Sequence, residues 1–147
     1  MYKRILVATD GSELSHVAVQ HALRLAQATG AEVVALKVVP KYPQSYFEGS
    51  VVLAAEEIEK IEQQWQAEAA AIVGGIQTEA NALGVKLHPL TVAADLVAEA
   101  LIATAQAHEC DLIVMASHGR KGLQRLLLGS ETQQVLTHSH IPVLVLR

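Results

Sequence analysis

Residues 115–131 read Met-Ala-Ser-His-Gly-Arg-Lys-Gly-Leu-Gln-Arg-Leu-Leu-Leu-Gly-Ser-Glu. They begin at the end of a continuous apolar run, residues 112–115, and finish at a Gly-Ser pair that opens a helical pattern. A glycine-containing loop between a buried strand and a helix N-terminus offers backbone N–H groups and a positive dipole to an anion, most often a phosphate. The loop also carries Arg120, Lys121 and Arg125 in an otherwise acidic chain. The stretch predicts a strand, a loop and a helix arranged around a nucleotide site.

Length and composition bound the class of protein. The 147 residues are enough for one domain, 1–147, with a buried core. They are 51% hydrophobic, 3% aromatic and 18% charged, so the core must be aliphatic, which suits a parallel sheet covered by helices on both faces. The net charge of −4 argues against a surface for nucleic acid or for an anionic membrane. No segment has the uncharged apolar length of a membrane span and the start does not resemble a signal peptide, so we expect a cytoplasmic protein.

Apolar periodicity predicts strands that alternate with helices. The strands are expected over residues 4–8, 33–39, 85–90, 112–116 and 141–146. The helices are expected from Leu14 to Gly30, from about Val52 to Gly84, from Leu96 to Ala107 and from Ser130 to His138, with Gly74-Gly75 weakening the continuity of the second. This alternation implies parallel pairing and right-handed crossovers. The chain is predicted to be an α/β protein with a five-stranded, doubly wound parallel sheet.

The candidate site lies where two strands end. Ligands of such sheets bind beyond the carboxyl ends of the strands, at the point where the strand order reverses. Two of these ends carry polar residues here: residues 9–12 (Thr-Asp-Gly-Ser) and the glycine loop after the fourth strand. Asp10 either accepts hydrogen bonds from ribose hydroxyls or caps the first helix, alone or with Ser12. Ser130 either binds phosphate at the helix N-terminus or forms a capping box with Gln133. The loop cations are either phosphate contacts or solvated charges.

Other chemistries have weaker support in the residues. His118 fits a general acid or base, but no catalytic partner is visible, and the other histidines lack the spacing of metal ligands, so no metal site is assigned. Cys110 is interpreted as a small buried hydrophobic residue rather than a reactive thiol. The motifs Gly-x-x-x-x-Gly-Lys-Ser/Thr, Gly-x-Gly-x-x-Gly and Gly-x-Ser-x-Gly are absent from the sequence. Their absence argues against a P-loop NTPase, a dinucleotide-dependent dehydrogenase and an α/β-hydrolase.

Four segments carry a family resemblance. They are residues 4–12 (Arg-Ile-Leu-Val-Ala-Thr-Asp-Gly-Ser), 111–119 (Asp-Leu-Ile-Val-Met-Ala-Ser-His-Gly), 122–130 (Gly-Leu-Gln-Arg-Leu-Leu-Leu-Gly-Ser) and 141–146 (Ile-Pro-Val-Leu-Val-Leu). Together, in this order, they resemble the universal stress protein family over essentially the whole chain. The resemblance implies the strand order 3-2-1-4-5, which makes the first and fourth strands neighbours. It also implies a homodimer that pairs through the last strand, Val143–Leu146, whose apolar edge would otherwise be an aggregation risk.

The same resemblance bears on nucleotide binding. Members that bind ATP have a motif similar to Gly-x-x-Gly, nine residues, then Gly-Ser/Thr. This chain has Ala116-Ser117-His118-Gly119, nine residues and Gly129-Ser130, so only the first glycine differs. If that glycine needs a positive φ, Ala116 costs on the order of 1 kcal/mol and distorts the loop. If it only lets the backbone approach ribose, one methyl group is tolerated or weakens affinity. We favour tolerance, because the rest of the motif is intact.

The ligand implied by the resemblance is ATP or AMP, with Mg²⁺ or Mn²⁺ entering only through its phosphates. Asp10 would hold the ribose, and the backbone near Val38 would meet the adenine. The other binding residues implied are Met115, Ala116 and Gly119 at the ribose and first phosphates, Gly129, Ser130 and Glu131 at the outer phosphates, and Arg120 in the loop.

Three functions fit these residues. The first is a stress-response module whose dimer or partner contacts depend on the bound nucleotide. The second is an interaction module of the same fold without nucleotide, which meets an unidentified protein partner through its dimer surface and the Tyr42–Phe47 loop. The third, least favoured, is a slow ATPase, because phosphoryl transfer needs a positioned nucleophile and a metal, and only Asp10, Glu131 and His118 are at hand. No catalytic residue is assigned, and neither nucleic acid nor membrane is expected as a partner.

Overall fold

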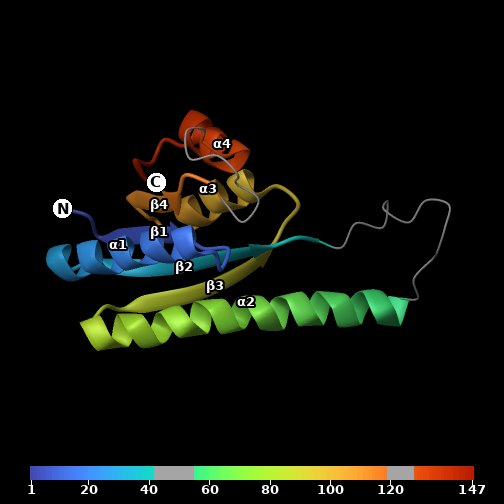
Figure 1. The fold of residues 1–147 in the computed structure, drawn as a ribbon. Coiled ribbons are helices and arrows are strands. Elements are labelled where there is room, and N and C mark those ends of the chain that lie inside the picture. The colour runs from blue at the N-terminus through green and yellow to red at the C-terminus, as the bar shows by residue number, and fades with distance from the viewer. Residues whose placement is uncertain (42–54, 119–127) are drawn as a thin grey trace.

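The computed structural model describes residues 1–41, 55–118 and 128–147, which form a parallel sheet between two layers of helices (Figure 1). The sheet has five strands in the order β3-β2-β1-β4-β5, all paired in parallel. Along the chain the elements are β1 (Arg4–Ala8), α1 (Glu13–Thr29), β2 (Glu32–Val39), α2 (Ala55–Leu83), β3 (Leu87–Ala93), α3 (Val97–Ala107), β4 (Leu112–Ala116), α4 (Ser130–His138) and β5 (Val143–Leu146). The predicted fold class is confirmed, as is the strand order that the family resemblance implied.

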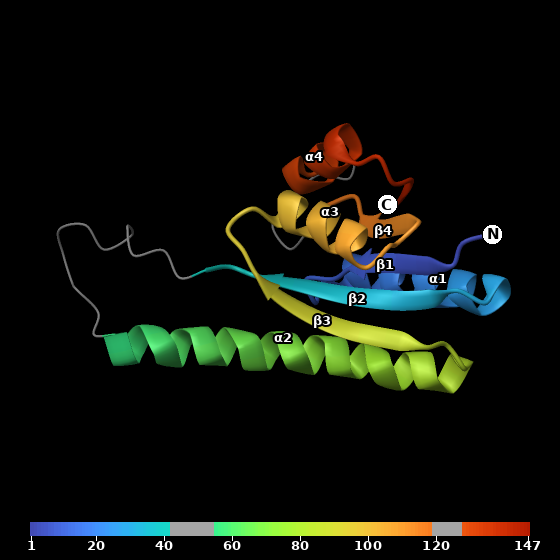
Figure 2. The ribbon, with the colours of Figure 1, turned by 180° about the vertical axis from the view of Figure 1, so that it is seen from behind.

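The core lies on both faces of the sheet, because the central strands are apolar on both sides. In β1, Ile5 and Val7 pack with α1 and α2, whereas Leu6 packs with α3 and α4, and all three side chains are inaccessible to solvent. Figures 1 and 2 show α1 and α2 on one side of the sheet and α3 and α4 on the other. The strand order reverses between β1 and β4. A doubly wound sheet opens a crevice at that point, beyond the carboxyl ends of its strands.

Among the strands, β3 and β5 differ most from their predicted ranges. β3 runs over Leu87–Ala93 instead of 85–90, because its pairing with β2 continues to Val39 opposite Ala93. Pro89 is tolerated there because β3 is at the edge of the sheet, where a missing N–H group leaves no partner unsatisfied. β5 begins at Val143 rather than at Ile141, whose backbone N–H and carbonyl are both bonded by the hydroxyl of Ser139.

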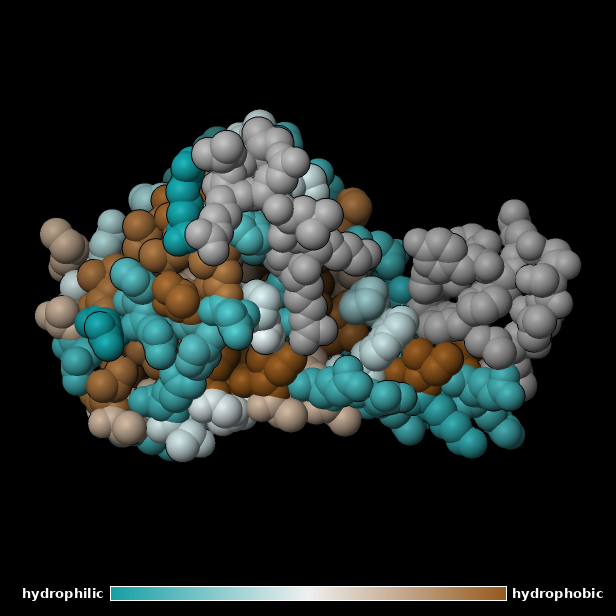
Figure 3. Space-filling view, viewed as in Figure 1, coloured by the Kyte–Doolittle hydropathy of each residue, from teal (hydrophilic) through white to brown (hydrophobic). Residues whose placement is uncertain are grey.

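The helix α2 is continuous through Gly74-Gly75, so the predicted weakness there was wrong. Both glycines are exposed on the helix surface with open space where a side chain would be. The buried side chains of α2 lie from its midpoint onward: Ala69, Val73, Ile76 and Ala80. The N-terminal half extends past the carboxyl end of the sheet, and its lower side in Figure 3 is hydrophilic. None of the helices within the described ranges is both long enough and apolar enough to cross a bilayer.

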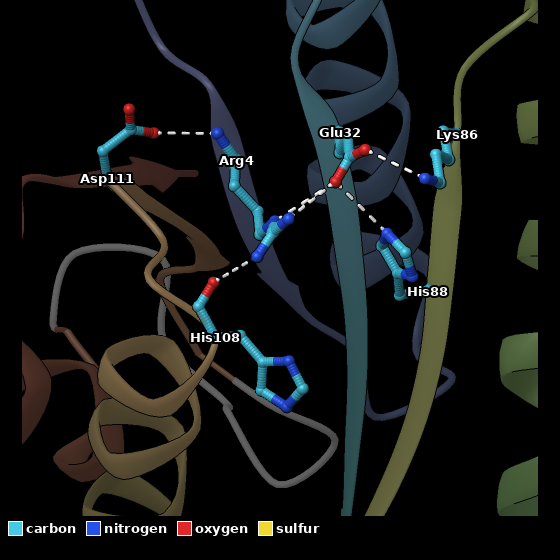
Figure 4. Close-up of polar contacts among 6 residues, drawn as sticks. All are labelled: Arg4, Glu32, Lys86, His88, His108 and Asp111. Carbon is cyan, nitrogen blue, oxygen red and sulfur yellow. Dashed lines mark hydrogen bonds and ion pairs between the residues drawn. The ribbon is translucent and has the colours of Figure 1, made fainter.

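At the amino end of the sheet, one carboxylate joins three strands (Figure 4). Glu32 of β2 accepts from the guanidinium of Arg4 on β1 at 2.9 Å. The ammonium of Lys86, just before β3, lies 3.2 Å from the same carboxylate, and His88 Nε2 of β3 lies 3.3 Å from it. These groups, Arg4 first and then Lys86 and His88, lower the pKa of Glu32 from its ordinary 4.5 to about 2.

Arg4 and Asp111 extend these ties to the end of α3 and the start of β4. The Arg4 guanidinium also donates to the carbonyl of His108 at 2.7 Å. The Asp111 carboxylate accepts from the backbone N–H groups of Lys3, at 2.8 Å, and Arg4, at 3.1 Å. The amino ends of β1, β2, β3 and β4 are thus tied together by charged hydrogen bonds, and we call this the closed end of the sheet. We call the carboxyl ends, where a cavity lies, the open end.

The lowered pKa of Glu32 predicts a loss of stability in acid. A carboxylate that is more acidic in the folded chain stabilises it fully above the unfolded pKa, near 4.5, and stops doing so as the pH falls towards about 2. We expect the difference in unfolding free energy between wild type and Glu32→Gln to be greatest at neutral pH and to shrink across this window. Urea unfolding as a function of pH measures it, with Glu56→Gln at the exposed start of α2 as the control. A difference that stays constant down to the lowest pH would contradict the assignment.

Candidate functional site

A cavity of about 640 Å³ lies at the carboxyl ends of β1, β2 and β4, between the start of α4 and the connection from β3 to α3. Its volume is in the range typical of sites for small organic ligands. The predicted site residues that line it are Asp10, Val38, Met115, Ala116, Gly129, Ser130 and Glu131. Gly119, Arg120, Lys121 and Arg125 lie outside the described residues, as does the Tyr42–Phe47 loop. The two strand ends predicted to form the site, those of β1 and β4, therefore each contribute residues to this one cavity.

The turn after β1 presents Asp10 to this cavity. Ser12 is the N-cap of α1, with its hydroxyl accepting from the N–H of Ser15 at 3.2 Å. The carboxylate of Asp10 accepts from the backbone N–H of Ser12 at 2.9 Å, and Gly11 takes the positive φ, 82°, that reverses the chain. Of the two readings of Asp10, helix capping belongs to Ser12. Asp10 instead braces the turn and lines the cavity wall.

Val38 presents a peptide edge beside Asp10. The last ladder bond between β1 and β2 runs from the N–H of Thr9 to the carbonyl of Leu36 at 3.0 Å. Peptide groups of a strand alternate in direction, so those of Val38, two residues further on, point to the same side, where β1 has already turned away. The ammonium of Lys37 donates to the Val38 carbonyl at 3.1 Å. Val38 thus combines a backbone donor and acceptor at the cavity, as recognition of a flat polar ring requires.

The start of α4 forms the opposite wall. Its N-cap is Gly129, which has no side chain to cap the helix, and Ser130 is already helical. Of the two alternatives for Ser130, the capping box with Gln133 is therefore excluded: the Gln133 side chain instead donates to the carbonyl of Leu128 at 3.3 Å. The backbone N–H groups of the first turn consequently face the cavity that Ser130 and Glu131 line, at the positive end of the helix dipole.

Close backbone contacts fix this helix end against β4. The N–H of Gly129 donates to the carbonyl of Ser117 at 2.7 Å, and a Cβ at Gly129 would lie 3.2 Å from the Cα of His118. The buried hydroxyl of Thr132 donates to the carbonyl of Ala116 at 3.0 Å. The close approach of the two backbones favours glycine at 129, because a Cβ there would require its neighbours to shift.

Ala116 has the ordinary backbone of a strand. It is the last residue of β4, opposite Leu146 of β5, and Glu109 is the one residue other than glycine with a positive φ in the described part of the chain. The possibility that position 116 needs a glycine for its φ is therefore excluded in this chain. The alanine methyl group adds no backbone strain.

Some cavity residues escaped the sequence reasoning: Ser15, Lys37, Asp95 and Thr132. Asp95 was missed because β3 was placed too early, which left this residue far from a strand end. A lysine within the apolar run of residues 33–39 was the one signal for Lys37. No three His, Cys, Asp or Glu side chains of residues 1–41, 55–118 and 128–147 gather as ligands for a metal.

His118 and Cys110 differ in their relation to the cavity. His118 lines it, with Nδ1 3.2 Å from the hydroxyl of Ser117. Cys110 is buried in the core beside α3, and desolvation raises the pKa of its thiol to about 11. The thiol stays protonated at neutral pH, which confirms the interpretation of Cys110 as a small core residue.

Comparisons with known proteins agree with this architecture. The model of the universal stress protein family matches residues 1–147. Universal stress protein MJ0531 of Methanocaldococcus jannaschii is 36% identical over 149 residues, which cover 100% of this chain and 83% of that protein. The solved structure of MJ0577, from the same archaeon, has a TM-score of 0.84 at 30% identity, over 99% of this chain and 96% of that one. A universal stress protein solved in complex with cAMP has a TM-score of 0.73 at 29% identity, over 99% and 97% of the two chains.

The backbone at Ala116 predicts that restoring the motif glycine destabilises the protein. Since no positive φ has to be accommodated there, Ala116→Gly adds unfolded-state entropy and removes a buried methyl group, so it is expected to lower the unfolding free energy by about 1–2 kcal/mol. Gly30→Ala is the comparison variant. The φ of Gly30 is 76°, a conformation that strains alanine, so this variant is also expected to lower the unfolding free energy. Urea unfolding of both variants checks this. A gain of stability in Ala116→Gly would show that the alanine is strained.

Proposed function

Because the chain belongs to the universal stress protein family, we propose that it binds an adenine nucleotide, ATP or AMP, in the cavity at the carboxyl ends of β1, β2 and β4. The observation that carries the proposal is the start of α4, a helix end with glycine at its N-cap that faces Asp10 across the cavity. The complex of a related universal stress protein with cAMP supports an adenine nucleotide as the ligand.

The polarity of the cavity orients the nucleotide. Phosphates bind best at the first turn of α4, where Ser130 and Glu131 contribute backbone N–H groups at the positive end of the dipole. The cavity is also lined by apolar side chains that suit the faces of a purine: Leu36, Pro40, Val97 and Leu101. In this orientation the peptide edge of Val38 meets the adenine, and the carboxylate of Asp10 accepts from the ribose hydroxyls. Mg²⁺ or Mn²⁺ would be carried by the phosphates.

The nucleotide acts in this proposal as a ligand of a signalling or protective module in the cytoplasm. Hydrolysis would need a base and an aligned water at the outer phosphate. The carboxylate of Asp10 is bonded to the turn after β1, and His118 Nδ1 lies beside its neighbour Ser117. An ATPase therefore stays the weaker candidate. An interaction module without nucleotide is the main alternative, and the first test below separates it from the proposal.

We also propose that the protein is a homodimer paired through β5. The carbonyls of Pro142 and Leu146 accept from β4, so these even-numbered residues direct their peptide groups into the sheet. The peptide groups of Val143 and Val145 point the other way, to the edge beyond β5. An apolar edge strand of this kind is a template for pairing with a second chain, and Leu144 is 39% exposed beside it.

The phosphate end of the cavity is tested by Ser130→Asp. A carboxylate in the first turn favours the helix dipole but repels phosphate, so we expect ATP to bind about tenfold or more weakly, as the loss of a charged hydrogen bond implies, and adenosine to bind unchanged. Calorimetric titration of wild type, Ser130→Asp and the control Ser130→Ala measures this. Heat-denatured wild type should also release adenine nucleotide, and saturating ATP should raise its stability by about 2–4 kcal/mol. No released nucleotide together with no thermal shift would favour the module without nucleotide.

The dimer is tested by a matched pair at Val145. Val145→Pro removes an N–H group that points to the outer edge and leaves the bonds between β4 and β5 intact, whereas Val145→Thr keeps that N–H group. We expect a dimer for wild type and Val145→Thr and a monomer for Val145→Pro in light scattering coupled to size exclusion. A Val145→Pro protein that remains dimeric would place the interface elsewhere.

A further inference from the structure

Two buried hydroxyl groups lie beneath the turn that carries Asp10. Ser15, in the first turn of α1, is 3% exposed, and Thr9, directly after β1, is 8% exposed. Their oxygens are 3.3 Å apart. Ser15 Oγ also donates to the carbonyl of Ser12 at 2.9 Å and accepts from the backbone N–H of Asp10 at 3.4 Å. The two hydroxyls therefore form a small buried polar centre between the end of β1 and the start of α1.

The two hydroxyls accept hydrogen bonds from peptide groups that belong to neither a strand nor a helix. β1 ends at Ala8 and α1 begins at Glu13, so the peptides between them have left the sheet ladder and have not entered the helix. Buried backbone donors need a partner, and side-chain hydroxyls are the usual substitute in turns. Ser15 accepts from Asp10, and Thr9 Oγ1 accepts from the N–H of Gly11 at 3.2 Å.

Asp10 is consequently held at both ends. Its peptide N–H is bonded to Ser15, and its carboxylate accepts from the N–H of Ser12 at 2.9 Å. A carboxylate can select ribose hydroxyls only when its direction is fixed before the ligand arrives, because a misplaced acceptor loses most of the interaction. The side chain of Ser12 caps α1, whereas the hydroxyl of Ser15 accepts from the Asp10 peptide N–H.

We propose that Ser15 is a positioning residue of the nucleotide site, whose hydroxyl sets the direction in which Asp10 meets the ribose. The inference rests on the proposed nucleotide function. It assigns ribose selectivity to a residue that acts through Asp10, although Ser15 also lines the cavity itself. The two routes, through Asp10 or by direct contact, make different predictions for the double variant.

The test compares ATP with 2′,3′-dideoxy-ATP, which lacks both ribose hydroxyls. We expect wild type to prefer ATP by about tenfold, as a charged hydrogen bond implies, and Asp10→Asn to lose most of this preference. Ser15→Ala should reduce it to about two- to threefold and weaken ATP while leaving 2′,3′-dideoxy-ATP nearly unchanged. In the double variant, the loss caused by Ser15→Ala should disappear, because the carboxylate through which it acts is gone.

The control is Thr29→Ala, which removes a hydroxyl bonded to the Leu25 carbonyl at the far end of the same helix. It should keep the preference of wild type, which separates a general effect on α1 from an effect on the site. A Ser15→Ala protein with an unchanged ratio of ATP to 2′,3′-dideoxy-ATP affinity would overturn the inference, and so would additive losses in the double variant. If wild type binds neither ligand, the proposed function itself fails.

A measurement without nucleotide completes the test. The Asp10 and Gly11 amides depend on the two buried hydroxyls, so their hydrogen exchange should accelerate in Ser15→Ala and not in Thr29→Ala. Unchanged exchange at both amides would show that Ser15 does not hold the turn, whatever the nucleotide affinities are.

Discussion

The site depends on the point at which the hydrogen bonds between β1 and β2 end. The last bond that joins β1 to β2 is made by Thr9, and the chain then turns away from the sheet into α1. Since β4 lies on the other side of β1 and the helices that follow these two strands cover opposite faces, a crevice opens beyond the ends of β1, β2 and β4. The peptide edge of Val38 faces this space because its neighbour has ended. The cavity is a direct consequence of strand order.

The two ends of the sheet satisfy their polar groups in different ways. At the amino end, the carboxylate of Glu32 contacts the side chains of Arg4, Lys86 and His88 (Figure 4). At the carboxyl end, the turn after β1 uses hydroxyls and a carboxylate for its own peptides, and α4 begins with a glycine. The closed end holds the strands together. The open end combines a fixed acceptor with a helix N-terminus suited to anions, a pairing that favours a ligand with both hydroxyls and phosphate.

Much of this architecture is predictable from the sequence, because a strand buried on both faces leaves an unmistakable apolar run. β1, β4 and α4 were expected over the ranges that the structure shows. The details that sequence reasoning missed depend on backbone geometry. Glycine and serine are both common N-cap residues. Whether Gly129 or Ser130 caps α4 depends on which of them lies outside the helical range of φ and ψ, which the sequence does not show. The backbone of Ala116 likewise follows from its pairing with β5, which a motif cannot show. Asp95 was missed because Pro89 weakens the strand pattern of β3, so the predicted strand ended before Ala93.

The most direct measurement is the titration of the amide spectrum of the unmodified protein with ATP, followed by two-dimensional NMR. If the open end of the sheet is a nucleotide site, the amides of Asp10, Val38 and Ser130 shift together along one saturable curve, while that of Glu32 at the closed end does not move. Amides that stay unchanged around the cavity, or that shift only at the closed end, would contradict the assignment of this cavity to a nucleotide.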